Sequence, residues 1–93
     1  MEEKVNVNIE LLAPINPEKE LNLHVTENCS LIDIVKTICC EETIYVSQLL
    51  DDNDISPYIR IGYNGQIIDS EEYESVMVKE GDNIVLISSV RGG

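Results

Sequence analysis

The sequence predicts a two-layer α+β domain in which one main helix packs on a mixed sheet of four to five strands. Three observations support this prediction. Apolar and polar residues alternate near the N-terminus, apolar residues recur at helical spacing in the middle of the chain, and alternation returns in the second half. With 93 residues, the chain is expected to form one domain over residues 1–93.

The first two elements are predicted to be strands over residues 5–11 and 21–26. In both segments every second residue is apolar, which gives a strand one buried face. The prolines within 13–17 separate the two strands. Because the strands lie so close in sequence, we expect them to pair as an antiparallel hairpin, with His24 on its polar face.

The third element is predicted to be a helix that begins near Ser30 and ends near Glu41–Glu42. Ser30 followed by Asp33 forms an approximate capping box, which satisfies free N–H groups at a helix start. Residues 43–50 are ambiguous between a second short helix and a continuation of the first. The buried stripe of the main helix is predicted to be Leu31, Ile34, Val35, Ile38 and Cys39.

An acidic turn is expected at residues 51–54. Its carboxylates invite comparison with a calcium-binding loop. However, an EF-hand loop needs Gly at its sixth position and Glu at its twelfth, and counting from Asp51 these positions hold Ser56 and Gly62. We therefore interpret the segment as a solvated turn.

The second half is predicted to hold three further strands. Asn64–Gly65 is a strong signal for a type I′ hairpin turn. Residues 69–75 are expected to form a loop or a single helical turn, and Gly81–Asp82 a last turn. The apolar run 84–87 is typical of a central strand with both faces covered or one face kept for a partner. The predicted strands are 58–63, 66–68 and 83–90.

The alternation also predicts a partner-binding face. Val85 and Ile87 fall on the sheet face opposite the helix, beside Tyr58 and Arg60. Exposed apolar residues close to the chain end indicate a docking surface, unless a loop covers them. The residues expected to face the helix instead are Ile59, Ile61, Tyr63, Ile84 and Leu86.

Charge restricts the partners. Eighteen acidic residues against six basic ones give a net charge of −12, and such a surface repels phosphate backbones and anionic lipid heads. We therefore expect neither a nucleic acid nor a membrane partner, but a protein with a basic or apolar surface. The start of the sequence lacks the features of a signal peptide, so a cytoplasmic location is expected.

The sequence contains no pattern typical of an enzyme. We find no Ser-His-Asp arrangement, no Gly-rich phosphate loop and no metal-ligand spacing. We therefore expect no catalytic side chain, no metal site and no cofactor. Cys29, Cys39 and Cys40 are expected to be reduced thiols, with Cys39 serving as a small core residue.

The ending Gly92–Gly93 is the one candidate reactive site. Two residues without Cβ atoms are slim enough to enter a narrow channel, where a carboxylate can be attacked or activated. The alternative is a frayed tail that happens to end in glycines, since termini are usually loose.

Over nearly its whole length the chain resembles the ubiquitin-like β-grasp sulfur carriers of the MoaD/ThiS type, and within them the small subunit of molybdopterin synthase. Ser88–Ser89 stands where that family usually has two prolines. Arg91 stands where it usually has a small residue, so that the ending Arg-Gly-Gly looks more like ubiquitin. The positions that carry the resemblance are, in order, Asn64–Gly65, Gly81–Asp82, the run 84–87, Val90 and Gly92–Gly93.

The resemblance implies chemistry at Gly93. An adenylating enzyme of the ubiquitin-activating type would convert its carboxylate to an acyl-adenylate and then to a thiocarboxylate, with 90–93 as a flexible tail that includes Arg91 and Gly92. The sulfur would pass to a synthase large subunit or another acceptor, in molybdopterin, thiamine or tRNA thiolation. Two alternatives remain: a protein modifier joined through Gly93 to lysines, and an interaction domain whose glycines have no role.

Overall fold

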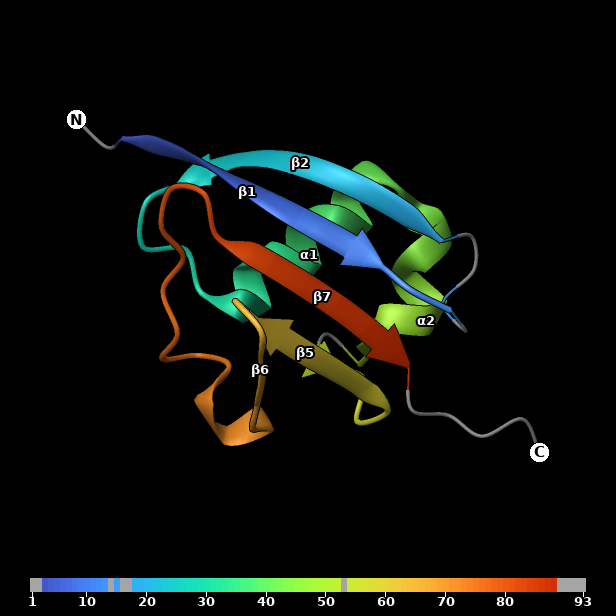
Figure 1. Cartoon of the computed structure of the whole chain (residues 1–93). Coiled ribbons are helices and arrows are strands. Elements are labelled where there is room, and N and C mark those ends of the chain that lie inside the picture. The colour runs from blue at the N-terminus through green and yellow to red at the C-terminus, as the bar shows by residue number, and fades with distance from the viewer. Residues whose placement is uncertain (1–2, 14, 16–17, 53, 89–93) are drawn as a thin grey trace.

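The computed structural model describes residues 3–13, 15, 18–52 and 54–88 (Figure 1). A five-stranded mixed sheet forms one layer, and the main helix, α1 (Leu31–Glu41), lies behind it in the view of Figure 1. This arrangement is the β-grasp fold, and the predicted α+β class with one main helix is confirmed.

The sheet has the strand order β2-β1-β7-β5-β6. The strands β1 (Lys4–Leu11) and β2 (Lys19–Thr26) pair antiparallel, as their closeness in sequence predicted. The last strand, β7 (Asn83–Ser88), lies in the centre of the sheet, parallel to β1 and antiparallel to β5 (Ile59–Tyr63). The short β6 (Gln66–Ile68) pairs with β5 and closes that side.

The helix α1 (Leu31–Glu41) begins with the predicted capping box. The backbone N–H of Asp33 donates to Ser30 Oγ at 3.2 Å, and the Ser30 N–H donates to Asp33 Oδ2 at 3.3 Å. Two N–H groups that the first turn leaves without a helical partner are thereby satisfied. All five residues of the predicted stripe are buried.

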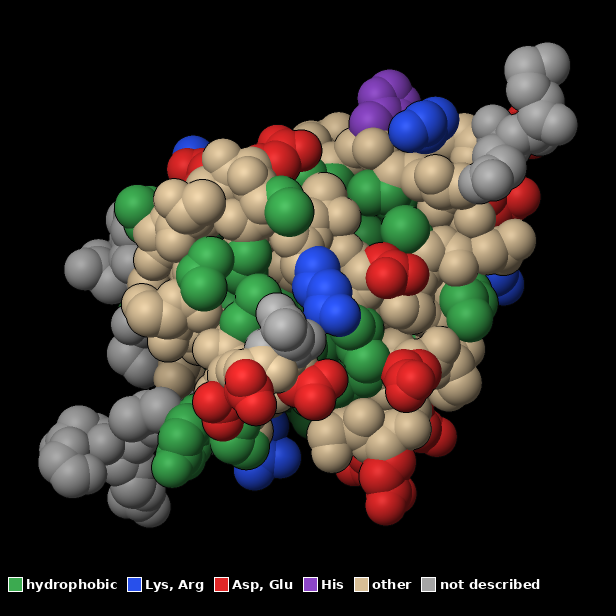
Figure 2. Space-filling view, turned by 180° about the vertical axis from the view of Figure 1, so that it is seen from behind, with side chains coloured by type: hydrophobic (Ala, Val, Ile, Leu, Met, Phe, Trp, Pro, Cys, Tyr) green, Lys and Arg blue, Asp and Glu red, His purple; other side chains and the backbone are tan. Residues whose placement is uncertain are grey.

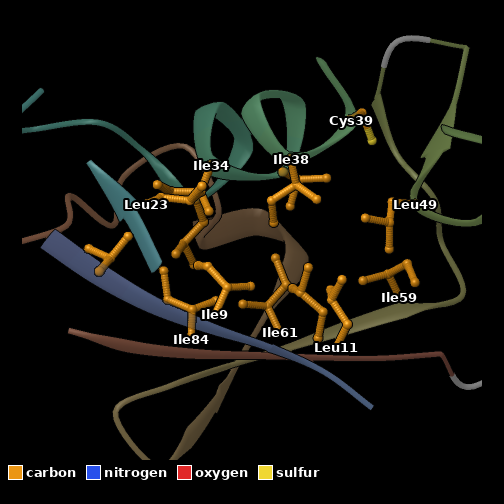
Figure 3. Close-up of a cluster of buried hydrophobic side chains, with 14 of the residues drawn as sticks. Ile9, Leu11, Leu23, Ile34, Ile38, Cys39, Leu49, Ile59, Ile61 and Ile84 are labelled. Carbon is orange, nitrogen blue, oxygen red and sulfur yellow. The ribbon is translucent and has the colours of Figure 1, made fainter. Parts of the chain in front are cut away.

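The core lies between this stripe and the inner face of the sheet. Ile34 and Ile38 point from α1 toward Ile9, Ile61 and Ile84 of the strands (Figure 3). Each of these five side chains is almost fully buried. Removing this apolar surface from water stabilises the helix against the sheet. Because Ile84 is part of this contact, the central strand β7 is held against the helix.

Within the ambiguous segment 43–50, residues 43–49 form a separate short helix rather than a continuation of α1. It consists of the 3₁₀ turn η1 (Thr43–Tyr45) followed by α2 (Val46–Leu49). Tyr45 and Leu49 are fully buried, whereas Ile44 is 57% exposed.

Asp51 and Asp54, at the two ends of the expected acidic turn, belong to strands. The strands β3 (Leu50–Asp51) and β4 (Asp54–Ile55) form a small separate hairpin, with Asp52 at φ +56°. The expected turn is therefore the turn of a hairpin, with Asp51 paired to Asp54, and the two short strands were not predicted. A two-residue strand is too short to show an alternation in the sequence.

Two further connections agree with the prediction. Asn64 and Gly65 have φ values of +50° and +92°, as a type I′ hairpin turn requires. The single helical turn η2 (Ser70–Glu72) follows β6. Within the described residues, no helix is long and apolar enough to cross a membrane.

Candidate functional site

The candidate site begins at the carboxyl end of β7, where the described chain ends. Ser88, the last described residue, lies opposite Ile59 at the start of β5. On the other side of β7, the Leu12 N–H donates to the Leu86 carbonyl at 3.1 Å. The strand is thus held on both sides close to its carboxyl end. The predicted tail residues Val90, Arg91, Gly92 and Gly93 lie outside the described residues.

Three of the four residues predicted to bind a partner share the outer face of the sheet, which is the face away from α1. Val85 and Ile87 are half-buried there, and Arg60 is exposed. Arg60 lies directly opposite Ile87 in the pairing of β5 with β7. The fourth, Tyr58, lies in the turn before β5 and is 57% exposed.

The sequence reasoning missed one apolar residue of this face. Ile67 is 60% exposed and lies opposite Gly62, which in turn lies opposite Val85. A Cβ atom on Gly62 would lie 3.7 Å from Val85 Cβ and 3.9 Å from Ile67 Cδ1. Gly62, which has no side chain, therefore lies between the side chains of Val85 and Ile67. We call Gly62, Ile67, Val85 and Ile87 the outer apolar patch.

The register of the hairpin could have revealed Ile67. A two-residue Asn-Gly turn pairs Tyr63 with Gln66, and the next pair is then Gly62 with Ile67. Since the two members of a pair point to the same face of a sheet, Ile67 must share the outer face with Gly62. Because Ile67 and Ile68 are both apolar, the sequence of this strand does not show which of them faces outward.

The other half of the outer face is polar. The Asn22 side-chain amide donates to Asn8 Oδ1 at 2.7 Å, across β1 and β2. Glu10 lies opposite Val85, at the boundary between the polar half and the outer apolar patch. The face therefore offers a partner an apolar region beside β7 and a hydrophilic region beyond it.

A polar cluster around Asp82 fixes the β5–β6 hairpin to the start of β7. The Asp82 carboxylate accepts hydrogen bonds from the Tyr63 hydroxyl, from Asn64 Nδ2 at 3.1 Å and from the Lys79 N–H at 2.7 Å. Burial, followed by the hydrogen bond to Asp82, raises the pKa of Tyr63 to about 12. The cluster holds the hairpin that carries Ile67, and the sequence reasoning did not foresee it.

The cysteines do not form a second site. Cys39 is buried in the core, and burial, with a smaller effect from Cys40, raises the pKa of its thiol. A thiol with a raised pKa is a weaker source of nucleophilic thiolate. Cys29 is half-buried and Cys40 exposed. Among the described residues, no three His, Cys, Asp or Glu side chains are grouped so that they could hold a metal ion.

Solved structures of archaeal proteins share this fold. The crystal structure of small archaeal modifier protein 1 from Haloferax volcanii has a TM-score of 0.79 at 16% identity, covering 95% of this chain and 99% of that one. The solution structure of the protein of that name from Methanosarcina acetivorans has a TM-score of 0.78 at 21% identity, covering 98% and 99%. The Caldiarchaeum subterraneum ubiquitin is more distant, with a TM-score of 0.57 at 22% identity over 97% and 99%. At these identities the likeness shows the fold.

No curated protein matches the chain at a significant level. The sequence model of the ThiS family matches residues 26–93, a segment that includes α1, β5, β6, β7 and Gly92–Gly93. Members of this family are small carrier proteins that are not themselves enzymes, and the family implies an activating enzyme of the ubiquitin-activating type as a partner. The chain therefore belongs to the ThiS family, as a ubiquitin-like β-grasp protein.

Proposed function

We propose that the protein is a sulfur carrier and that the Gly93 carboxylate is its reactive group. The observation that carries this proposal is the extent of the family match, which runs through Gly92–Gly93. The position of β7 supports it, because the chain leaves the sheet from a central strand that is held on both sides. In this proposal, residues 1–93 form one domain and 90–93 a flexible tail.

The chemistry needs no side chain of the carrier. The Gly93 carboxylate attacks the α-phosphorus of ATP in the activating enzyme and releases pyrophosphate, which leaves an acyl-adenylate. Sulfide then attacks the acyl carbon, expels AMP and gives up its proton, which leaves a thiocarboxylate. Gly92, without a Cβ atom, lets the end of the chain enter a narrow channel.

The outer apolar patch, together with Arg60 and Tyr58, is the proposed docking surface for the activating enzyme. Ile87 immediately precedes Ser88, where the described chain ends. The five residues 89–93 span at most about 18 Å when extended, so an enzyme seated on the patch would have its adenylating site within that reach. The net charge of −12 favours a partner with a basic rim, mainly through the rate of encounter.

The proposed acceptor is the large subunit of a molybdopterin synthase in the cytoplasm, with thiamine thiazole and thiolated tRNA synthesis as the other branches. The ordered motifs Asn64–Gly65, Gly81–Asp82 and Gly92–Gly93 support the first branch. A strain that lacks this gene should lose one of the three sulfur-containing products. The product that disappears identifies the branch, and a strain that loses none of them contradicts the carrier function.

A second candidate function is protein modification through Gly93. Two observations favour it: the ending Arg91-Gly92-Gly93, and the likeness in fold to proteins named small archaeal modifier protein 1. Trypsin cuts after Arg91, so a lysine joined to Gly93 would keep a Gly-Gly remnant after digestion. Many remnants that disappear with deletion of this gene would promote the modifier function over the carrier function.

A further inference from the structure

A groove on the helix side of the molecule is separate from the outer apolar patch. Two adjoining hollows, of about 410 and 380 Å³, share Ile32, Asp54 and Glu74 and so form one elongated depression. It lies between the start of α1, the strand β4 and the segment that contains η2. Each hollow has the volume of an ordinary ligand site, but the groove is open along its length.

Part of the lining of the groove is apolar. Ile32 of α1 and Ile55 of β4 are half-buried, and both pack against the edge of the core. Ile59 and Tyr73 line the base and are themselves buried. Met77 stands at the far end and is 40% exposed. Covering the exposed parts of these side chains would remove further apolar surface from water, which favours binding.

The rim of the groove is mainly acidic. Asp33, Asp54 and Glu74 are exposed there, with Lys36 as the cation among the described lining residues. Asp33 belongs to the capping box, whereas the carboxylates of Asp54 and Glu74 form no ion pair within the described part of the chain. Figure 2 views the helix side, where hydrophobic side chains are exposed between carboxylates.

We propose that this groove binds a basic amphipathic helix of a partner protein. Such a helix would place apolar side chains on Ile32 and Ile55 and a Lys or Arg beside each of Asp54 and Glu74. Helices that bind in grooves present their apolar anchors on one face, at positions i, i+3, i+4 and i+7. The acidic rim repels phosphates and nucleic acids, and charge complementarity therefore selects a cationic protein segment.

The groove and the outer apolar patch lie on opposite sides of the sheet. Ile59 faces inward and lines the groove, whereas its neighbour Arg60 is exposed on the outer face. A helix in the groove therefore leaves the outer apolar patch accessible. The inference does not rest on sulfur chemistry at Gly93, so each proposal can fail without the other.

A titration followed by backbone amide NMR tests the groove with a synthetic probe. The probe is a short helical peptide with leucines on one face and lysines on the other, and the control peptide has glutamate at every lysine position. We expect saturable shifts centred on Ile32, Ile55 and Glu74 with the lysine peptide, and none with the glutamate peptide. Shifts centred on Val85 and Ile87, or no saturable binding of the lysine peptide, would overturn the inference.

Two charge-reversal variants provide the matched comparison. Asp54→Lys with Glu74→Lys should weaken binding of the lysine peptide by about tenfold or more, which corresponds to roughly 1.4 kcal/mol. Glu20→Lys with Glu27→Lys changes the net charge equally, at exposed positions outside the groove, and should leave affinity nearly unchanged. An equal loss in both variants would mean that net charge alone attracts the peptide. If the first variant fails to fold, Glu74→Gln alone repeats the test.

Discussion

Arg60 and Ile87 face each other across the pairing of β5 with β7, one residue before the described chain ends at Ser88. A cation and an apolar side chain are thus presented together on the outer face, beside the point where the tail begins. Because β7 is the central strand of the sheet, this pair is held by the most enclosed part of the fold. The described chain therefore ends beside a defined surface.

Ile87→Asp should weaken binding of the activating enzyme by about tenfold or more, because a carboxylate would have to be desolvated in the interface. The free energy of unfolding should change by less than about 1 kcal/mol, since the side chain faces outward. Titration calorimetry and urea unfolding measure the two quantities. His24→Asp, exposed on β2, is the control and should change neither. A large loss of stability in Ile87→Asp would mean that its face is wrongly assigned.

Gly62→Ala should leave the fold intact and raise the free energy of unfolding by about 0.4–1 kcal/mol, because alanine restricts the unfolded chain. The added methyl group would make ordinary contacts with Val85 and Ile67, at 3.7 and 3.9 Å. Urea unfolding of both proteins gives the difference. A destabilisation of more than about 1 kcal/mol, beyond the usual range of a tolerated change, would contradict the space found beside Gly62.

Tyr63 should make stability sensitive to alkaline pH. Its folded pKa, raised to about 12 by burial and then by Asp82, lies above the unfolded value of about 10. The stability that this difference contributes is fully present below about pH 10 and is lost as the pH rises through about 12. Tyr63→Phe should therefore lose less stability than the wild type between these values. Equal slopes in the two proteins would show that the hydroxyl does not titrate as described.

Ser30→Ala should lower the free energy of unfolding by about 1 kcal/mol, because the Asp33 N–H loses the acceptor of the capping box. Ser47→Ala, at an exposed position of α2, is the matched control and should change stability by less than about 0.5 kcal/mol. Thermal or urea unfolding measures both. Similar losses in the two variants would mean that the cap contributes little.

The main layers could be predicted from the sequence because their residues repeat with a clear period. The alternation in β1 and the five-residue stripe of α1 each mark one buried face, and Asn64–Gly65 marks a turn by its positive φ values. These patterns are local, so they can be recognised in the sequence without knowing which segments pack together in the fold. They were sufficient to place Val85 and Ile87 on the outer face.

Features that depend on contacts between distant segments could not be predicted. The groove beside α1 brings together Ile32 of α1, Asp54 of β4 and Glu74 of the turn after η2. The Asp82 cluster joins residues that are up to 19 positions apart. Tyr45 is fully buried although its neighbour Ile44 is exposed, and this difference in burial depends on tertiary packing. No local period reports such contacts.

The intact mass of the protein, taken after incubation with its activating enzyme, ATP and sulfide, tests the central claim most directly. We expect the wild type to gain the mass of one sulfur in place of one oxygen, and the variant lacking Gly93 to gain nothing. Cys29→Ser with Cys40→Ser should behave like the wild type, since the sulfur belongs on Gly93. Sulfur on the protein without Gly93, or its loss from the cysteine variant, would place the chemistry on a thiol and contradict the account.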